Sequence, residues 1–409
     1  MEAVIADLAE HWPLYAAIPF VAAIIGYVTK RVAIEMMFRP LDFVGIKGTF
    51  LGWQGIVPRH GGRMAAVATE LLTSNLIDLG DVVAKINPDR IVAEIEQPLL
   101  RTIDETARGI LEQHYPRVWE AMPALGQDLV IKQLQASAPR LVRQLADDLR
   151  TNVHEVIDIK HMAVRKLTED KALLVGLIRE TSRPEMRFIA RSGIYFGFLL
   201  GVVQALVWAL TKEPLVLPIF GGCIGLFTDW LAIKLIFVPR EPVRLGRRFT
   251  LQGKFQRRRA EVAHQYGELI ARDVLTVSNL VDALVHGPRS DRTYAMIHRM
   301  VANAIDEQAR LARPFIGSAA SGSRLRDVKR AASVRAVRQL PEAVRPAEGY
   351  LTEAMDVANM VERRMLELTP LQYEALLRPA FRQDEWKLIT VGGVIGFLVG
   401  ELQVLVMLH

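Results

Sequence analysis

Four long apolar stretches constrain this chain more than any other feature of its sequence. They run from about residue 12 to 38, 190 to 210, 215 to 238 and 388 to 408. A helix needs about 20 predominantly apolar residues to cross the hydrocarbon core of a bilayer. One such stretch is compatible with a buried helix of a soluble protein, but four of them predict an all-α membrane protein with four transmembrane helices.

Two polar blocks of similar length separate the apolar stretches, at residues 39–188 and 239–386. Both are rich in Arg, Glu, Leu and Ala, residues that favour helices, so we expect each block to be helical. In the first block an apolar stripe recurs at helical spacing, which we interpret as core packing between helices. The stripe consists of Leu141, Leu145, Leu149, Val153 and Val156.

The charge distribution predicts how the chain crosses the membrane. Basic residues gather directly after the first and third apolar stretches, whereas the N-terminus carries three acidic residues and no Lys or Arg before residue 12. Loops rich in Lys and Arg stay in the cytoplasm, so we expect both polar blocks to be cytoplasmic and both termini to lie outside. Such a start does not resemble a cleaved secretory signal, so the first stretch is expected to remain as an anchor.

The densest basic cluster follows the third stretch and also predicts contact with anionic lipid headgroups. With a span so near, we expect no nucleic-acid partner for it. It consists of Arg247, Arg248, Arg257, Arg258 and Arg259.

The chain reads as a tandem duplication, with repeat one at residues 1–210 and repeat two at 211–409. The segment "IPFVAAIIGYVTKRVAIEMMFRP" aligns with "LPIFGGCIGLFTDWLAIKLIFVP". The offset of 199 residues is constant along the segment, as it is between the second and fourth stretches. Two spans in each copy give both copies the same orientation, which is a parallel repeat.

Glycines recur every four residues in the second and fourth stretches, on one helix face in each. Such faces let a neighbouring helix approach closely in a membrane, and a glutamine near each end is positioned to add a hydrogen bond between helices. The residues are Gly193, Gly197, Gly201 and Gln204, then Gly392, Gly396, Gly400 and Gln403.

Charged residues near the ends of the first and third stretches are opposite in sign between the copies. Lys30 corresponds to Asp229, and Glu35 corresponds to Lys234. If the copies pack about a two-fold axis along the membrane normal, each pair meets at one depth, where a paired charge is tolerable. Exposure of all four to water at the cytoplasmic interface, or a proton or ion site, are the alternatives that the sequence leaves open.

The sequence carries no recognised catalytic or cofactor motif. Its single cysteine, Cys223, excludes an internal disulfide, and nine scattered histidines show no metal-ligand spacing. Phosphate loops, nucleophile elbows and zinc-binding helices are absent from the sequence as well. We therefore expect a protein that is not an enzyme and has no cofactor.

The motif Gly26-Tyr27-Val28-Thr29, continuing through Ala33-Ile34 to Phe38-Arg39-Pro40, resembles the bacterial membrane proteins grouped as "domain of unknown function 445", of the YheB/YjiN kind. The closing glycine and glutamine span resembles the same family. The resemblance covers nearly the whole chain and implies a multi-pass protein of the bacterial inner membrane, with no activity attached. Lys30 and Asp229 stand where the family tends to have Asn, and Glu35 stands where Lys is common.

Two functions fit these expectations. One is a membrane scaffold or envelope-organising protein that binds partners through its helical cytoplasmic blocks. The other is a transporter or lipid-handling protein with a site at the interface between the repeats. A cytoplasmic protein partner and self-association into a homo-oligomer are compatible with both functions.

Overall fold

The computed structural model describes residues 12–46, 52–245, 249–316, 322–377 and 385–408. The described residues are about 87% helical, which confirms the all-α expectation. Two short antiparallel hairpins, which the sequence did not predict, are the exceptions within the described residues. In the first, β1 (Val44–Gly45) pairs with β2 (Gly52–Trp53), and in the second, β3 (Val243–Leu245) pairs with β4 (Phe249–Leu251).

The chain folds into two compact units, and each unit takes segments from both halves of the sequence. Unit 1 comprises residues 1–68, 167–266 and 362–409, and unit 2 comprises residues 69–166 and 267–361. The expected repeats at 1–210 and 211–409 therefore do not form separate compact bodies. The divisions between the units fall inside each half of the sequence.

Unit 1 holds the apolar helices. They are α2 (Trp12–Phe38), α11 (Arg183–Thr211), α12 (Val216–Phe237) and α22 (Glu385–Leu408). Within the described residues, three helical segments are long and apolar enough to cross a membrane: Tyr15–Phe38, Arg183–Thr211 and Val216–Leu235. The apolar stretch of α22, Ile389–Leu405, is shorter.

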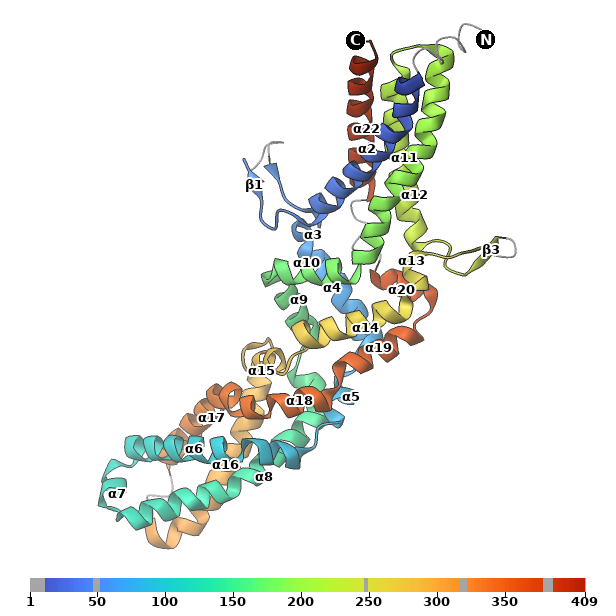
Figure 1. The fold of residues 1–409 in the computed structure, drawn as a ribbon. Helices are drawn as coiled ribbons and strands as arrows, with labels where there is room; N and C mark the ends of the chain where they lie inside the picture. Colours follow the sequence, from blue (N-terminus) through green and yellow to red (C-terminus); the bar gives the residue numbers. More distant parts are fainter. Residues whose placement is uncertain (1–11, 47–51, 246–248, 317–321, 378–384, 409) are drawn as a thin grey trace. The chain divides into compact units, whose positions relative to one another are not determined.

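These four helices form a bundle in which α2 packs along α11 and α12 packs along α22 (Figure 1). Further contacts join α11 to α12 and α2 to α22, so the two helix pairs are in contact with each other. Shorter elements complete unit 1, wholly or in part: α3 (Ile56–Arg59), α4 (Gly61–Leu71), α9 (Ile159–Glu169), α10 (Lys171–Thr181), α13 (Lys254–Arg257), α14 (Arg259–Leu269), α19 (Val357–Glu367) and α20 (Pro370–Leu377).

Unit 2 is built from long amphipathic helices. From the first half come η1 (Leu72–Leu76), α5 (Leu79–Ala84), α6 (Pro88–His114), α7 (Pro116–Ala121) and α8 (Ala124–Val156). From the second half come η2 (Ile270–Val274), α15 (Val277–His286), α16 (Ser290–Ile316), α17 (Ser323–Val344), η4 (Arg345–Ala347) and α18 (Glu348–Met355).

Local sequence signals mark where several of these helices begin. Asn87 caps α6 by accepting a hydrogen bond from the Asp89 amide, and Pro88 takes the first helical position, where its missing N–H costs nothing. Thr276 caps α15 in the same way, by accepting from the amide of Asn279. The helices then pack α6 on α8 and α16 on α17, with α6 also contacting α17.

Candidate functional site

The structure brings Lys30 and Asp229 together inside the bundle. Lys30 lies on α2 and Asp229 on α12, and their Nζ and Oδ1 atoms are 3.2 Å apart. The side chains are 1% and 9% exposed, so neither faces water. A lone charge among apolar helices is costly, whereas a close opposite charge offsets much of the lost hydration.

The expected contact between Glu35 and Lys234 is replaced by two separate contacts. Arg179, on α10, donates a 2.6 Å hydrogen bond to Glu35. Lys234 is exposed and its Nζ lies 4.6 Å from the centre of the Trp230 ring. The physical reason is that α10 supplies a nearer cation at the half-exposed end of α2, and the sequence pattern could not place that helix.

The glycines of α11 and α22 lie where these helices closely approach α2 and α12. Gly193 faces Gly26, and Gly392 and Gly396 face α12 in the equivalent way. A methyl group at Gly197 would lie 2.6 Å from the carbonyl oxygen of Ala22, and one at Gly201 would lie 2.8 Å from the Ala22 Cβ. Gly400 lies just as close to Pro218. No side chain fits at these positions without moving a backbone.

A pair of side-chain amides joins α11 to α22 at the end of the bundle far from Lys30. The Gln204 side chain donates to the Gln403 side-chain oxygen and to the backbone carbonyl of Leu217, each at 3.2 Å. Gln204 is 1% exposed. The bundle therefore has polar contacts at two levels, with close glycine crossings between them.

The basic cluster is mostly engaged in contacts within the protein. Arg258 lies 2.7 Å from Glu185 and 2.5 Å from Glu261. The hydrogen bond from Arg258 lowers the pKa of Glu261 below its usual value. Arg259 donates to the carbonyls of Met365, Leu366 and Leu368, which leaves the exposed Arg257 available to a headgroup. The other two predicted lipid contacts, Arg247 and Arg248, lie outside the described residues.

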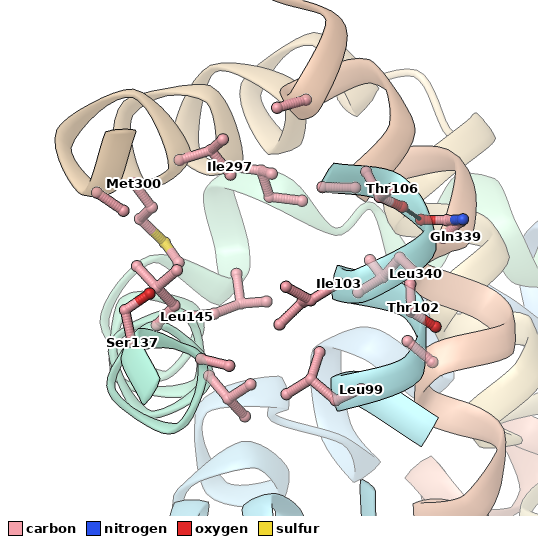
Figure 2. Close-up of a pocket in the computed structure, with 18 of the residues that line it drawn as sticks. Leu99, Thr102, Ile103, Thr106, Ser137, Leu145, Ile297, Met300, Gln339 and Leu340 are labelled. Atoms are coloured by element: carbon pink, nitrogen blue, oxygen red, sulfur yellow. Dashed lines mark hydrogen bonds between the residues drawn. The ribbon is translucent and has the colours of Figure 1, made fainter. Parts of the chain in front are cut away.

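Unit 2 contains a large apolar cavity that the sequence did not predict. Its volume is about 1220 Å³, and its walls come from α5–α8 of the first half and α15–α18 of the second. In Figure 2, Leu99 and Ile103 of α6 point across it toward Leu145 of α8. On the other sides lie α16, with Ile297 and Met300, and α17.

Four of the five residues in the apolar stripe on α8 line this cavity, whereas the fifth, Val156, is buried outside the lining. Leu141, Leu145 and Leu149 are half-buried, whereas Val153 is 1% exposed. Small side chains on the facing helices leave the space unfilled. They include Ala304, Ala309, Ala332, Ala336 and Ala343. The alanines of α17 recur at helical spacing in the sequence, and this is the signal that could have suggested a cavity.

Polar groups in the cavity wall are few and are hydrogen-bonded in part to one another. The Thr106 hydroxyl donates to the Gln339 side-chain oxygen at 3.0 Å, joining α6 to α17 (Figure 2). Arg150 is the charged residue among the described lining residues, and it donates to the backbone carbonyls of Ala84 and Ile86. The wall thus offers an extended apolar surface, with the hydrogen-bonded guanidinium of Arg150 at one end.

The apolar helices and the homologues together identify a membrane protein. The chain is 22% identical to a UPF0754 membrane protein of Synechococcus sp. (strain JA-3-3Ab), over 97% of this chain and 99% of that protein. It is 27% identical to a UPF0754 membrane protein of Bacillus licheniformis, over 34% of this chain and 35% of that protein. A UPF0754 membrane protein of Nostoc punctiforme is also 27% identical, over 36% of each chain.

No protein-family model matches the chain. No solved structure matches it either.

Proposed function

We propose that this chain is a multi-pass bacterial inner-membrane protein that handles lipid, taking acyl chains into the cavity of unit 2. It is not an enzyme, and it crosses the membrane four times as two parallel copies of one span–block–span repeat. The observation that carries the proposal is the apolar cavity of about 1220 Å³. Small-molecule sites usually occupy about 300–1000 Å³ and present several converging polar groups, so this cavity fits a larger and more apolar ligand.

The dimensions of the cavity favour chains over compact molecules. Its lining residues on α8 run from Gly126 to Val153. At a rise of 1.5 Å per residue this is a distance of about 40 Å, which is long enough for extended acyl chains. Each buried methylene contributes about 0.8 kcal/mol, so an apolar wall of this length provides the main driving force for binding.

The membrane bundle favours an anchoring role over a conduit. Lys30 and Asp229 are buried against each other, and the glycine crossings bring helix backbones into contact. A transport pathway along these charges would require them to line a wet cavity between the helices. The same closed bundle supports the second candidate, a membrane scaffold, in which the helical blocks bind a cytoplasmic protein.

Photo-crosslinking tests the proposal on the full-length protein in its native membrane. Cells are fed a fatty acid with a photoactivatable group, the membranes are irradiated, and modified peptides are mapped by mass spectrometry. We expect adducts on lining segments of α6, α8 and α16. The variant Ala146→Trp places a large ring at a half-buried lining position and should reduce these adducts several-fold.

The matched control is Ala136→Trp, on an exposed position of the same helix that does not line the cavity. It should leave the adducts unchanged. If adducts fall only on the apolar helices of unit 1, or if both tryptophan variants behave like the unmodified chain, lipid handling by unit 2 is refuted. A stoichiometric protein partner that co-purifies in that case would favour the scaffold.

A further inference from the structure

We propose that the α7 end of the cavity docks on the surface of a lipid bilayer, so that acyl chains enter there while the headgroup stays at the mouth. This inference rests on the proposed lipid-handling function and adds to it an interaction surface and an orientation for the ligand. We name this surface the α7 rim, defined by Val118, Leu125 and Leu129.

The cavity reaches solvent at the α7 rim. Among its described lining residues, the exposed ones are Val118, Leu129 and Gln133, all on α7 or the first turns of α8. The rest of the described lining is buried or half-buried. Exposure concentrated at one end of a long cavity marks that end as the entrance.

The rim presents more apolar surface to water than a soluble helix end normally does. Val118 is 39% exposed, Leu125 75% and Leu129 61%. Leu125 and Leu129 are four residues apart, so they project from one face of α8. An exposed apolar patch that continues into an apolar cavity indicates an interaction site rather than scattered surface hydrophobics.

Charges around the rim suit a membrane interface. The exposed cations Arg117 and Lys132 flank it, and long basic side chains can reach headgroups while their stems lie along apolar surface. Of the nearby acids, Asp128 lies 2.7 Å from Arg108 in an ion pair, and Glu120 is exposed. An apolar face bordered by basic residues is the usual composition of helices that lie in the bilayer interface.

The opposite end of the cavity is unsuited to a charged headgroup. Its cation, Arg150, donates to the backbone carbonyls of Ala84 and Ile86, and these contacts fix its guanidinium. Between that end and the rim, the wall offers hydroxyl and amide groups but no acidic side chain among the described lining residues. The ligand that fits best is an amphiphile with its tails pointing toward Arg150 and its head at the α7 rim.

An environment-sensitive fluorophore tests the docking in the intact protein. In a Cys223→Ser background, Leu129→Cys is labelled with a nitrobenzoxadiazole dye, and the same label at Ala136→Cys, exposed elsewhere on α8, is the control. The labelled protein is measured in three states: in nanodiscs, in nanodiscs with added protein-free liposomes, and in proteoliposomes. We expect a blue shift and brighter emission for the Leu129 label but not for the Ala136 label.

The three states distinguish which membrane is contacted. A shift only on adding liposomes identifies a second bilayer, whereas a shift already present in proteoliposomes identifies the membrane that holds the protein. Equal emission from both labels in every state would overturn the docking inference.

A double variant links docking to loading. Leu125→Asp with Leu129→Asp should slow uptake of a fluorescent lipid from donor liposomes several-fold. Unchanged uptake would contradict the α7 rim as the entrance. Acyl-chain crosslinking on the same samples distinguishes docking at the α7 rim from lipid handling by the cavity. If adducts form but the emission of the Leu129 label does not shift, only the docking inference is refuted. If no adducts form, lipid handling itself is refuted.

Discussion

Removing either member of the Lys30–Asp229 pair alone should destabilise the bundle more than removing both members together. The pair is buried, with 1% and 9% side-chain exposure and a 3.2 Å separation. Lys30→Ala leaves the Asp229 carboxylate among apolar helices, and breaking a buried pair in this way costs about 3–5 kcal/mol. Asp229→Ala leaves the ammonium in the same position, at a similar cost.

The double variant loses both charges at once, so no uncompensated charge remains. Replacing a buried pair with apolar residues is often nearly neutral. The two alanine variants should therefore be strongly non-additive, with a coupling free energy of about 3 kcal/mol or more, at the upper end of the range of about 0.5–3 kcal/mol found for residues in direct contact. The cavities left by the shortened side chains keep the double variant below the unmodified chain in stability.

Unfolding in mixed micelles at increasing SDS fraction measures this coupling. Tryptophan fluorescence follows it, because Trp208 is buried in the bundle against Tyr15 and Ile18. The control cycle uses Glu35→Gln and Arg179→Gln, whose ion pair is 45% and 35% exposed. Exposed pairs contribute about 0–1 kcal/mol, so this cycle should show little coupling. Additive losses at Lys30 and Asp229 would refute the reasoning that the pair supports the bundle.

Three further outcomes follow from the contacts in unit 1. Gly197→Ala should destabilise the bundle in the same SDS assay, because the added methyl group would meet the Ala22 carbonyl oxygen. Gly176→Ala meets nothing within 4 Å and should stabilise its helix by about 0.5–1 kcal/mol. If both variants changed the free energy of unfolding in the same direction, the close crossing at Gly197 would be contradicted. Gln204→Leu should cost about 0.6 kcal/mol or somewhat more, as measured for hydrogen bonds between membrane helices, and no loss would mean that the amide pair does not form. Hydrogen bonding from Arg258 lowers the pKa of Glu261, so this contact contributes fully to folding stability above the ordinary glutamate pKa. The contribution is lost as the pH falls through the lower pKa of the folded state. A Glu261→Gln variant should lack this loss of stability at acid pH when unfolding is followed against pH.

The sequence predicted features that lie within a single helix or within the motif that recurs at an offset of 199 residues. The apolar stretches and the helical character of the polar blocks were readable from composition and periodicity. The opposite signs at positions 30 and 229 suggested a contact that the structure brings to 3.2 Å. Their matching places in the two aligned segments were sufficient to suggest this contact.

Other features depend on how distant segments fill space, and the sequence could not supply that. Arg179 reaches Glu35 only because α10 packs beside α2, 144 residues away along the chain. Leu141 and Leu145 recur at the spacing of a packed helix face. A cavity lies beside them because the facing helices present small alanine side chains, and the stripe alone does not reveal this. The two hairpins are a few residues long, too short for an alternating pattern to stand out.

The composition of unit 2 from both halves has a consequence for how the chain is made. Its first cavity wall, α6 and α8, ends at Val156, and the facing wall begins with α15 at Val277. At about 5–20 residues per second, the ribosome needs roughly 6 to 24 seconds to synthesise the chain between them. During that interval α6 and α8 can pack on each other, but the helices of the second half that complete the cavity do not yet exist. A fragment ending near residue 210 would lack those helices and would leave the cavity-lining residues of α6 and α8 without their facing wall.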